Sequence, residues 1–156
     1  NIIMTQTDKE LLLKDLCARL PYGVKAEVTN TQGYHHENVA KKGEKTIDTL
    51  KGFDSSHNCF TVYHNNPLDW DWTCSEIDIE DIKPYLFPLS SMTEEQKKEY
   101  RKVCELDTEI LSKHPMDGTP FPALYHSQNW LNKNHFDTMG LIPMGLANDA
   151  TGKNIY

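Results

Sequence analysis

The stretch WDWTCSEIDIED, residues 70–81, gathers two tryptophans, a cysteine and several carboxylates. Carboxylates could ligate a hard cation, and the tryptophans could form a sugar-binding platform. The glycine and fixed spacing of calcium loops are absent, however. In one regular strand neither face would be consistently apolar, whereas a bulge or break near Thr73–Ser75 would reverse the alternation. We therefore favour a solvated acidic face, with four residues turned inward: Trp70, Trp72, Ile77 and Ile79.

Seven histidines and four cysteines supply the other candidates for chemistry. His57, Cys59, His64 and Cys74 could in principle bind zinc, but their spacing matches no standard structural site. The chain contains no nucleophile elbow, P-loop, Rossmann glycine pattern or HExxH motif. We expect no catalytic residue, no metal site and no cofactor, and we expect reduced cysteines that behave as small apolar residues. An enzyme whose site assembles only in three dimensions stays open as an alternative.

The charge of the chain is uneven. Residues 54–92 carry seven acids and one lysine, which accounts for −6 of the net charge of −7. An acidic chain gains little from counterion release on nucleic acid and is repelled by anionic membrane surfaces. No apolar run is long enough for a membrane helix, and the first residues lack the features of a secretory signal. We expect a cytoplasmic protein with a protein partner, whose identity the sequence does not indicate.

Periodicity predicts an amphipathic helix near the start of the chain. Thr7 and Glu10 are spaced as a capping box. An apolar stripe follows at helical spacing, and Pro21 is expected to end the helix. The stripe consists of Leu13, Leu16, Cys17 and Leu20. Residues 24–29 then alternate between apolar and polar side chains, as in a half-buried strand.

Strands are also predicted in TIDTLKGF and CFTVYH, which a turn-forming cluster separates. Thr93 and Gln96 are spaced as a second capping box, which predicts a helix that ends near Pro115. Its inner stripe is Tyr100, Val103, Cys104, Ile110 and Leu111. HPMDGTPFP is expected to be a linker, ALYHSQNWLNKNHF a helix, and NDATGKNIY a frayed end.

Three segments resemble a family of uncharacterised proteins from gut anaerobic bacteria, which often occur in mobile or phage-like regions. The segments are LLLKDLCARLPYGVK, IKPYLFPLSSMTEEQKKEY and WLNKNHFDTMGLIPMGLA. The family has no assigned activity. The resemblance therefore implies a common shape and an accessory role in a bacterial mobile element, and it implies no catalytic residue.

The stretch from Thr49 to Val62 is similar to the first motif of Sm-like RNA-binding proteins, with a glycine, an Asp-x-x-x-Asn sequence and alternating apolar residues. The resemblance implies that His57 and Asn58 would stack on and hydrogen-bond a base, and that Asp54 would orient Asn58. His57 replaces the apolar or aromatic residue that is usual in the family, and the second motif with its Arg-Gly pair is absent.

These patterns together predict an α+β protein. We expect an N-terminal helix on a small, strongly bent antiparallel sheet with the shape of an SH3-like or Sm-like barrel in residues 1–88. Residues 89–156 would form a helical extension, which could pack on the first part as one domain. The favoured function is a non-enzymatic interaction module, and the alternative is a module that binds single-stranded RNA.

Overall fold

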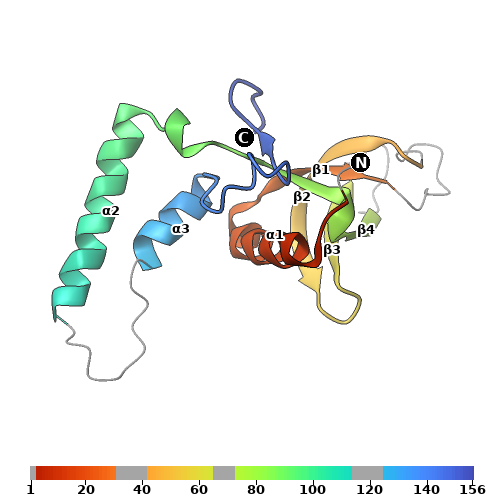
Figure 1. Ribbon diagram of the computed structural model, residues 1–156, viewed down its shortest axis with the longest axis horizontal. Helices are drawn as coiled ribbons and strands as arrows, with labels where there is room; N and C mark the ends of the chain where they lie inside the picture. The colour runs from red at the N-terminus through yellow and green to blue at the C-terminus, as the bar shows by residue number, and fades with distance from the viewer. Residues whose placement is uncertain (1–2, 31–41, 65–72, 114–124) are drawn as a thin grey trace.

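The computed structural model of the chain describes residues 3–30, 42–64, 73–113 and 125–156. An N-terminal helix packs against a six-stranded sheet, and two further helices follow (Figure 1). The predicted α+β class is confirmed. Among the described helices, none has the length and apolar character needed to cross a membrane. The elements are α1 (Gln6–Arg19), η1 (Leu20–Tyr22), β1 (Lys25–Thr29), β2 (Lys45–Asp54), β3 (Cys59–His64), β4 (Thr73–Asp78), η2 (Ile79–Asp81), β5 (Ile82–Leu86), η3 (Leu89–Ser91), α2 (Glu94–Lys113), α3 (Tyr125–Lys133) and β6 (Asn148–Asp149).

Helix α1 begins earlier than predicted. Its N-cap is Thr5, whose hydroxyl accepts a hydrogen bond from the N–H of Asp8, while the Asp8 carboxylate accepts one from the N–H of Thr5. The predicted box of Thr7 and Glu10 is therefore wrong, because an aspartate fills the same role two residues upstream. The helix ends before Pro21, as predicted.

The buried face of α1 contains an ion pair. Asp15 is 4% exposed and Arg19 is 0% exposed. Arg19 donates from Nε and Nη2 to the two carboxylate oxygens of Asp15, at 2.8 and 2.9 Å. Nη2 also donates to the backbone carbonyl of Phe136, at 2.7 Å. The pair therefore joins α1 to a segment more than one hundred residues away.

The buried face of α1 overlaps the predicted stripe only in part. Leu12 and Leu16 are fully buried, whereas the other three predicted members pack at the edge of the core, namely Leu13, Cys17 and Leu20. An apolar pattern assigns Asp15 and Arg19 to the surface, since charged side chains are rarely buried without a partner. Here each is the partner of the other.

The sheet has the strand order β4-β3-β2-β1-β5-β6. The alternation predicted for residues 24–29 is confirmed, because Val24, Ala26 and Val28 are buried. Strand β2 pairs with β1 over residues 45–49 and with β3 over residues 50–54, and its register shifts between Leu50 and Gly52. Such a shift bends a strand and increases its twist. In the described part of the chain the sheet is not closed, so the predicted barrel shape is not confirmed.

The acidic stretch lies on the outer face of β4, as predicted. Ile77 and Ile79 are buried, and the acids that alternate with them are exposed. The predicted break at Thr73–Ser75 is wrong, because β4 pairs with β3 in a regular register from Thr73 to Asp78. Trp70 and Trp72 lie outside the described residues.

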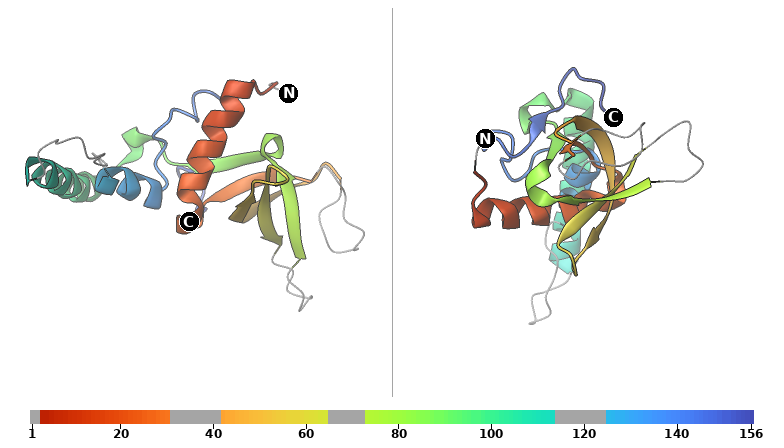
Figure 2. Two further views of the ribbon diagram at one scale, coloured as in Figure 1. Left: turned by 90° about the horizontal axis from the view of Figure 1, so that it is seen from below. Right: turned by 90° about the vertical axis from the view of Figure 1, so that its right-hand side faces the viewer.

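Helix α2 projects away from the sheet and packs on α3 (Figures 1 and 2). The predicted capping box is confirmed, since the N–H of Thr93 donates to Oε1 of Gln96 and the N–H of Gln96 donates to the Thr93 hydroxyl. The ring of Trp130 lies between those of Tyr100 and Phe136, with centroid distances of 5.4 and 5.9 Å. The expected linker, residues 114–122, lies outside the described part.

The last residues pack against the body, so the predicted fraying is wrong. Strand β6 pairs in parallel with β5. The Tyr156 hydroxyl donates to the carbonyl of Tyr85 and accepts from the N–H of Lys25, and its ring stacks on His135 at 3.7 Å. Burial raises the pKa of Tyr156 to about 12. The polar sequence of residues 148–156 does not predict the contacts of Tyr156, because their partners lie in distant segments of the chain.

Breaking the buried pair is expected to destabilise the protein strongly. Asp15→Ala leaves the Arg19 guanidinium buried without its counter-charge, which costs about 3–5 kcal/mol. Glu109→Ala removes one partner of an exposed pair with the same spacing, Glu109–Lys113, and should cost at most about 0.5 kcal/mol. Urea unfolding measures both free energies, and equal losses would contradict a structural role for the buried pair.

Candidate functional site

The turn between β2 and β3 carries the three residues that the Sm-like resemblance singles out. Asp54 ends β2, and residues 55–58 form the turn. Oδ1 of Asp54 accepts hydrogen bonds from the N–H and the hydroxyl of Ser56, at 2.8 and 2.5 Å. Asn58 has a φ of 54°, a left-handed conformation that asparagine tolerates better than most residues. The turn therefore fixes the Asp54 carboxylate.

His57 is the partner of the second carboxylate oxygen. Its Nδ1 lies 2.8 Å from Oδ2 of Asp54. The hydrogen bond to Asp54, and then the negative charges of Asp54 and Glu76, raise the pKa of His57 above its ordinary value. Hydrogen bonds from Ser56 and His57 hold the pKa of Asp54 well below its ordinary value. Asp54 thus orients His57 in this structure, whereas the resemblance implies that it orients Asn58.

Strand pairing adds a third ligand-type side chain to this turn. Glu76 on β4 lies opposite Thr61, and Asp78 lies opposite Cys59, which in turn lies opposite Asp54. One ligand atom from each of Asp54, His57 and Glu76 lies within 4.8 Å of the others. The sequence did not identify Glu76 as a site residue. Only the pairing of β4 with β3 brings Glu76 close to the turn.

Cys59 lies beneath this acidic face and is 3% exposed. Burial raises the pKa of its thiol, and the negative charges of Glu76, Asp54 and Asp78 raise it further. Since the thiolate is the reactive form, Cys59 is a poor nucleophile. The chemistry available on this face is cation binding, and anions are repelled.

The backbones of the zinc ligands considered from the sequence lie at both ends of β3. His57 is in the turn at one end, and His64 ends β3 at the other. A strand of this length separates its ends by about 17 Å, at about 3.3 Å per residue. Cys74 of β4 pairs with Tyr63 near the end that carries His64.

A second polar cluster lies at the start of α3. Asp107 of α2 is buried, and its carboxylate accepts hydrogen bonds from the backbone N–H groups of His126 and Ser127 and contacts Nδ1 of His126 at 2.9 Å. Burial alone would raise the pKa of Asp107, but the hydrogen bonds from Ser127 and His126 outweigh it and hold the pKa at about 2. A carboxylate that orients an imidazole occurs in catalytic triads. Here the carboxylate also caps α3, which sequence reasoning did not anticipate.

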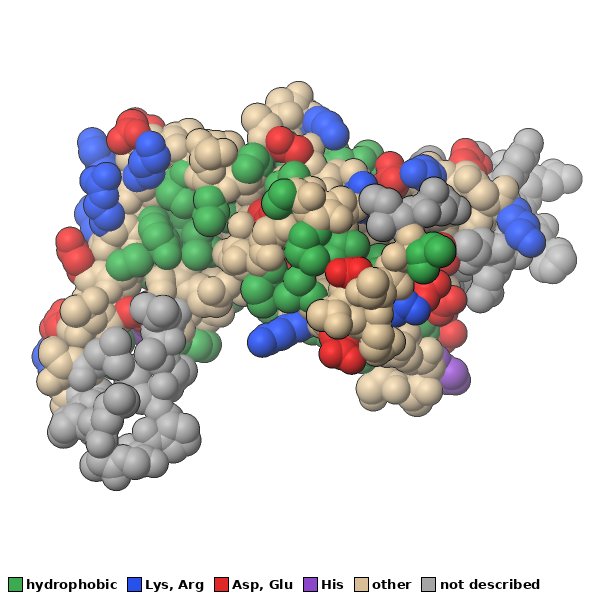
Figure 3. Space-filling view, viewed as in Figure 1, with side chains coloured by type: hydrophobic (Ala, Val, Ile, Leu, Met, Phe, Trp, Pro, Cys, Tyr) green, Lys and Arg blue, Asp and Glu red, His purple; other side chains and the backbone are tan. Residues whose placement is uncertain are grey.

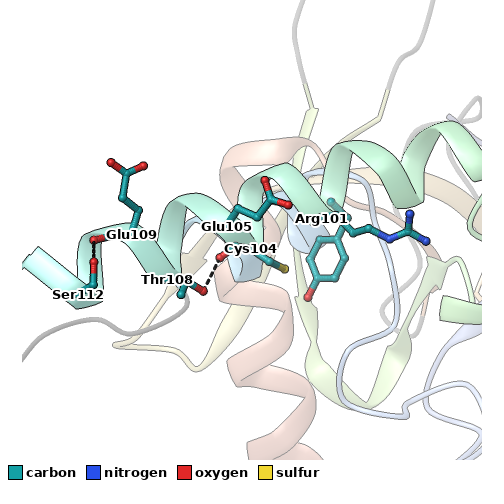
Figure 4. A pocket seen from close by; sticks show the side chains of 7 residues that line it. Arg101, Cys104, Glu105, Thr108, Glu109 and Ser112 are labelled. Carbon is teal, nitrogen blue, oxygen red and sulfur yellow. Dashed lines mark hydrogen bonds between the residues drawn. The ribbon is translucent and has the colours of Figure 1, made fainter.

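An open hollow of about 580 Å³ runs along α2 (Figure 4). The hydroxyl of Thr108 donates to the carbonyl of Cys104, and that of Ser112 donates to the carbonyl of Glu109. Burial, and then a hydrogen bond with Cys104, raise the pKa of Tyr100. The described lining consists of Tyr100, Arg101, Cys104, Glu105, Thr108, Glu109 and Ser112.

Comparisons with known proteins give no further guide to this site, since no family model, no curated protein and no solved structure matches the chain. The chemistry of the molecule is therefore inferred from its own geometry.

The capping role of Asp107 predicts a dependence of stability on pH. Its folded-state pKa of about 2 lies below the ordinary value of 3.8, so its stabilising effect is present above about pH 4 and is lost as the pH falls toward 2. Between pH 5 and 2.5 the melting temperature of the wild type should fall further than that of Asp107→Asn. Parallel decreases in the two proteins would rule out this role.

Proposed function

We propose that the protein is a non-enzymatic interaction module, an accessory protein that binds its partner through α2. The observation that carries this proposal is the position of α2. This helix of 20 residues, about 30 Å long, projects from the body and has α3 as its main packing partner. Hydrophobic side chains gather where α2 meets α3 (Figure 3). Such an exposed apolar region is typical of a surface that binds another protein.

The side chains of Cys104, Thr108 and Ser112 form a stripe along α2 that a bound partner can cover. The hydroxyls of Thr108 and Ser112 already donate to carbonyls of their own helix. A partner can therefore cover this stripe without leaving an unsatisfied donor, which would otherwise cost about 1–3 kcal/mol for each group. Leu106, on the opposite flank of α2, is 43% exposed and offers an alternative surface on the same helix.

The partner that fits this surface is an amphipathic helical segment of another protein. The hollow extends from Tyr100 to Ser112, a length of about 18 Å, which corresponds to about three turns of a helix. Glu105, Glu109 and Arg101 border it, and Glu109 pairs with Lys113. The segment would place apolar residues in the hollow and lysine or arginine beside Glu105, as in other helix-in-groove complexes.

A displayed library of randomised helical peptides tests the proposal. We expect enriched peptides with apolar residues at i and i+4 and a basic residue beside them. Thr108→Arg should weaken their binding by about tenfold or more, because it fills the hollow and repels the basic edge. Leu106→Arg introduces the same side chain on the other flank and serves as the matched control. Failure to enrich any peptide, or stronger loss with Leu106→Arg, would refute this surface.

RNA binding is the alternative function. The Sm-like resemblance and the bend of β2 at its register shift support a barrel-like shape, and His57 and Asn58 are exposed at the turn. The charge of the site opposes this function, because Asp54, Glu76 and Asp78 share the face beside the turn. Of the nearby lysines, Lys45 pairs with Glu27. We therefore place the protein interaction first.

A binding assay separates the two functions. At physiological salt we expect no saturable binding of a uridine-rich single-stranded oligonucleotide, because the acidic face repels phosphates. Base stacking typically contributes about 1–3 kcal/mol, so His57→Ala would weaken any binding that uses this turn by about five- to 160-fold. Micromolar binding that is lost in His57→Ala would establish the RNA-binding alternative.

A further inference from the structure

The β2–β3 turn brings together three side chains that ligate metals in other proteins. We propose that Asp54, His57 and Glu76 form a binding site for a divalent transition-metal ion such as Zn²⁺ or Ni²⁺. One ligand atom of each lies within 4.8 Å of the other two. This inference does not depend on the binding surface proposed for α2, which lies on a different element.

Asp54 and His57 are already arranged as neighbouring ligands. Ser56 occupies Oδ1 of Asp54 with two hydrogen bonds, and Oδ2 lies 2.8 Å from Nδ1 of His57. Bonds of about 2.0–2.2 Å to one zinc ion place adjacent ligand atoms about 3–3.5 Å apart. A small opening of this contact admits the ion, which then replaces the proton between Nδ1 and Oδ2.

The strands fix the backbone that carries the third ligand. Glu76 is held opposite Thr61 in the β3–β4 ladder, while Asp54 is held opposite Cys59 in the β2–β3 ladder. Both ladders share β3, so the backbone positions of the two carboxylates are set by the sheet and not by a loop. The Glu76 and His57 side chains are both exposed to solvent. Sites built on strands hold their ligands more precisely than sites built on loops.

The mixture of ligands selects the class of metal. Ca²⁺ and Mg²⁺ prefer oxygen ligands alone, whereas imidazole suits Zn²⁺, Ni²⁺ and Co²⁺. Asp78 lies on the same face, so its negative charge attracts a cation without belonging to the ligand set. Three protein ligands leave at least one coordination position for water.

Calorimetric titration of the tag-free full chain with Zn²⁺, Ni²⁺, Mg²⁺ and Ca²⁺ tests the site. We expect one Zn²⁺ or Ni²⁺ per chain and much weaker binding of Mg²⁺ and Ca²⁺. His57→Ala and Glu76→Gln should each lower the Zn²⁺ affinity by at least about tenfold, since loss of even an outer partner commonly costs that much. Asp78→Asn removes the same charge as Glu76→Gln from the same strand, and it should retain most of the affinity.

Three results would overturn the proposal. Equal losses in Glu76→Gln and Asp78→Asn, or equal binding of Ca²⁺, would show that the acidic face only attracts cations. Full Zn²⁺ affinity in His57→Ala would place the ion at other histidines. The absence of binding at millimolar Zn²⁺ would exclude the site. Melting curves of the metal-free variants verify that each exposed substitution leaves the fold intact.

Discussion

Arg19 is completely buried, so the fold has to supply groups that balance its charge. The carboxylate of Asp15, in the same helix, accepts two hydrogen bonds from Arg19. The backbone carbonyl of Phe136, in the segment after α3, accepts a third. The same region contains His135, stacked on Tyr156. Burial, and then the positive charges of Arg19 and Lys25, lower the pKa of His135 to about 4, so its ring is neutral where the stack forms. One cation in the N-terminal helix thus bonds directly to a segment near the other end of the chain.

The sheet separates a hydrophobic side from a charged side, and β2 and β3 contribute to both. On the core side, Phe60 and Val62 are fully buried and pack with α1. On the other side, the same ladders align Asp54, Glu76 and Asp78 around the buried thiol of Cys59. The strand register that buries Phe60 and Val62 therefore also places the three acids on the opposite face of the sheet. A slip by one residue would lose both together, because it exchanges the two faces.

Local patterns of the sequence predicted local structure well, including the alternation at 24–28 and the capping box that begins with Thr93. They misplaced the first capping box, which uses Thr5 and Asp8, and the break in β4, and they failed where residues far apart in the chain meet. Arg19 looked like a surface residue because its partner carbonyl is not visible in a helical pattern. Glu76 looked only solvated because its neighbours at the turn depend on strand register. Tyr156 looked frayed because its contacts come from three other segments. Spacing along the chain does not report such contacts.

The carbonyl that Arg19 binds lies 117 residues further along the chain, which has a consequence for synthesis on the ribosome. At roughly 5–20 residues per second, Phe136 is synthesised about 6 to 23 seconds after Arg19. During that interval α1 and the first strands exist without the segment that completes their packing. The nascent chain would expose apolar surface for all of this time. The packing of α1 can therefore be completed only after the segment around Phe136 has been synthesised.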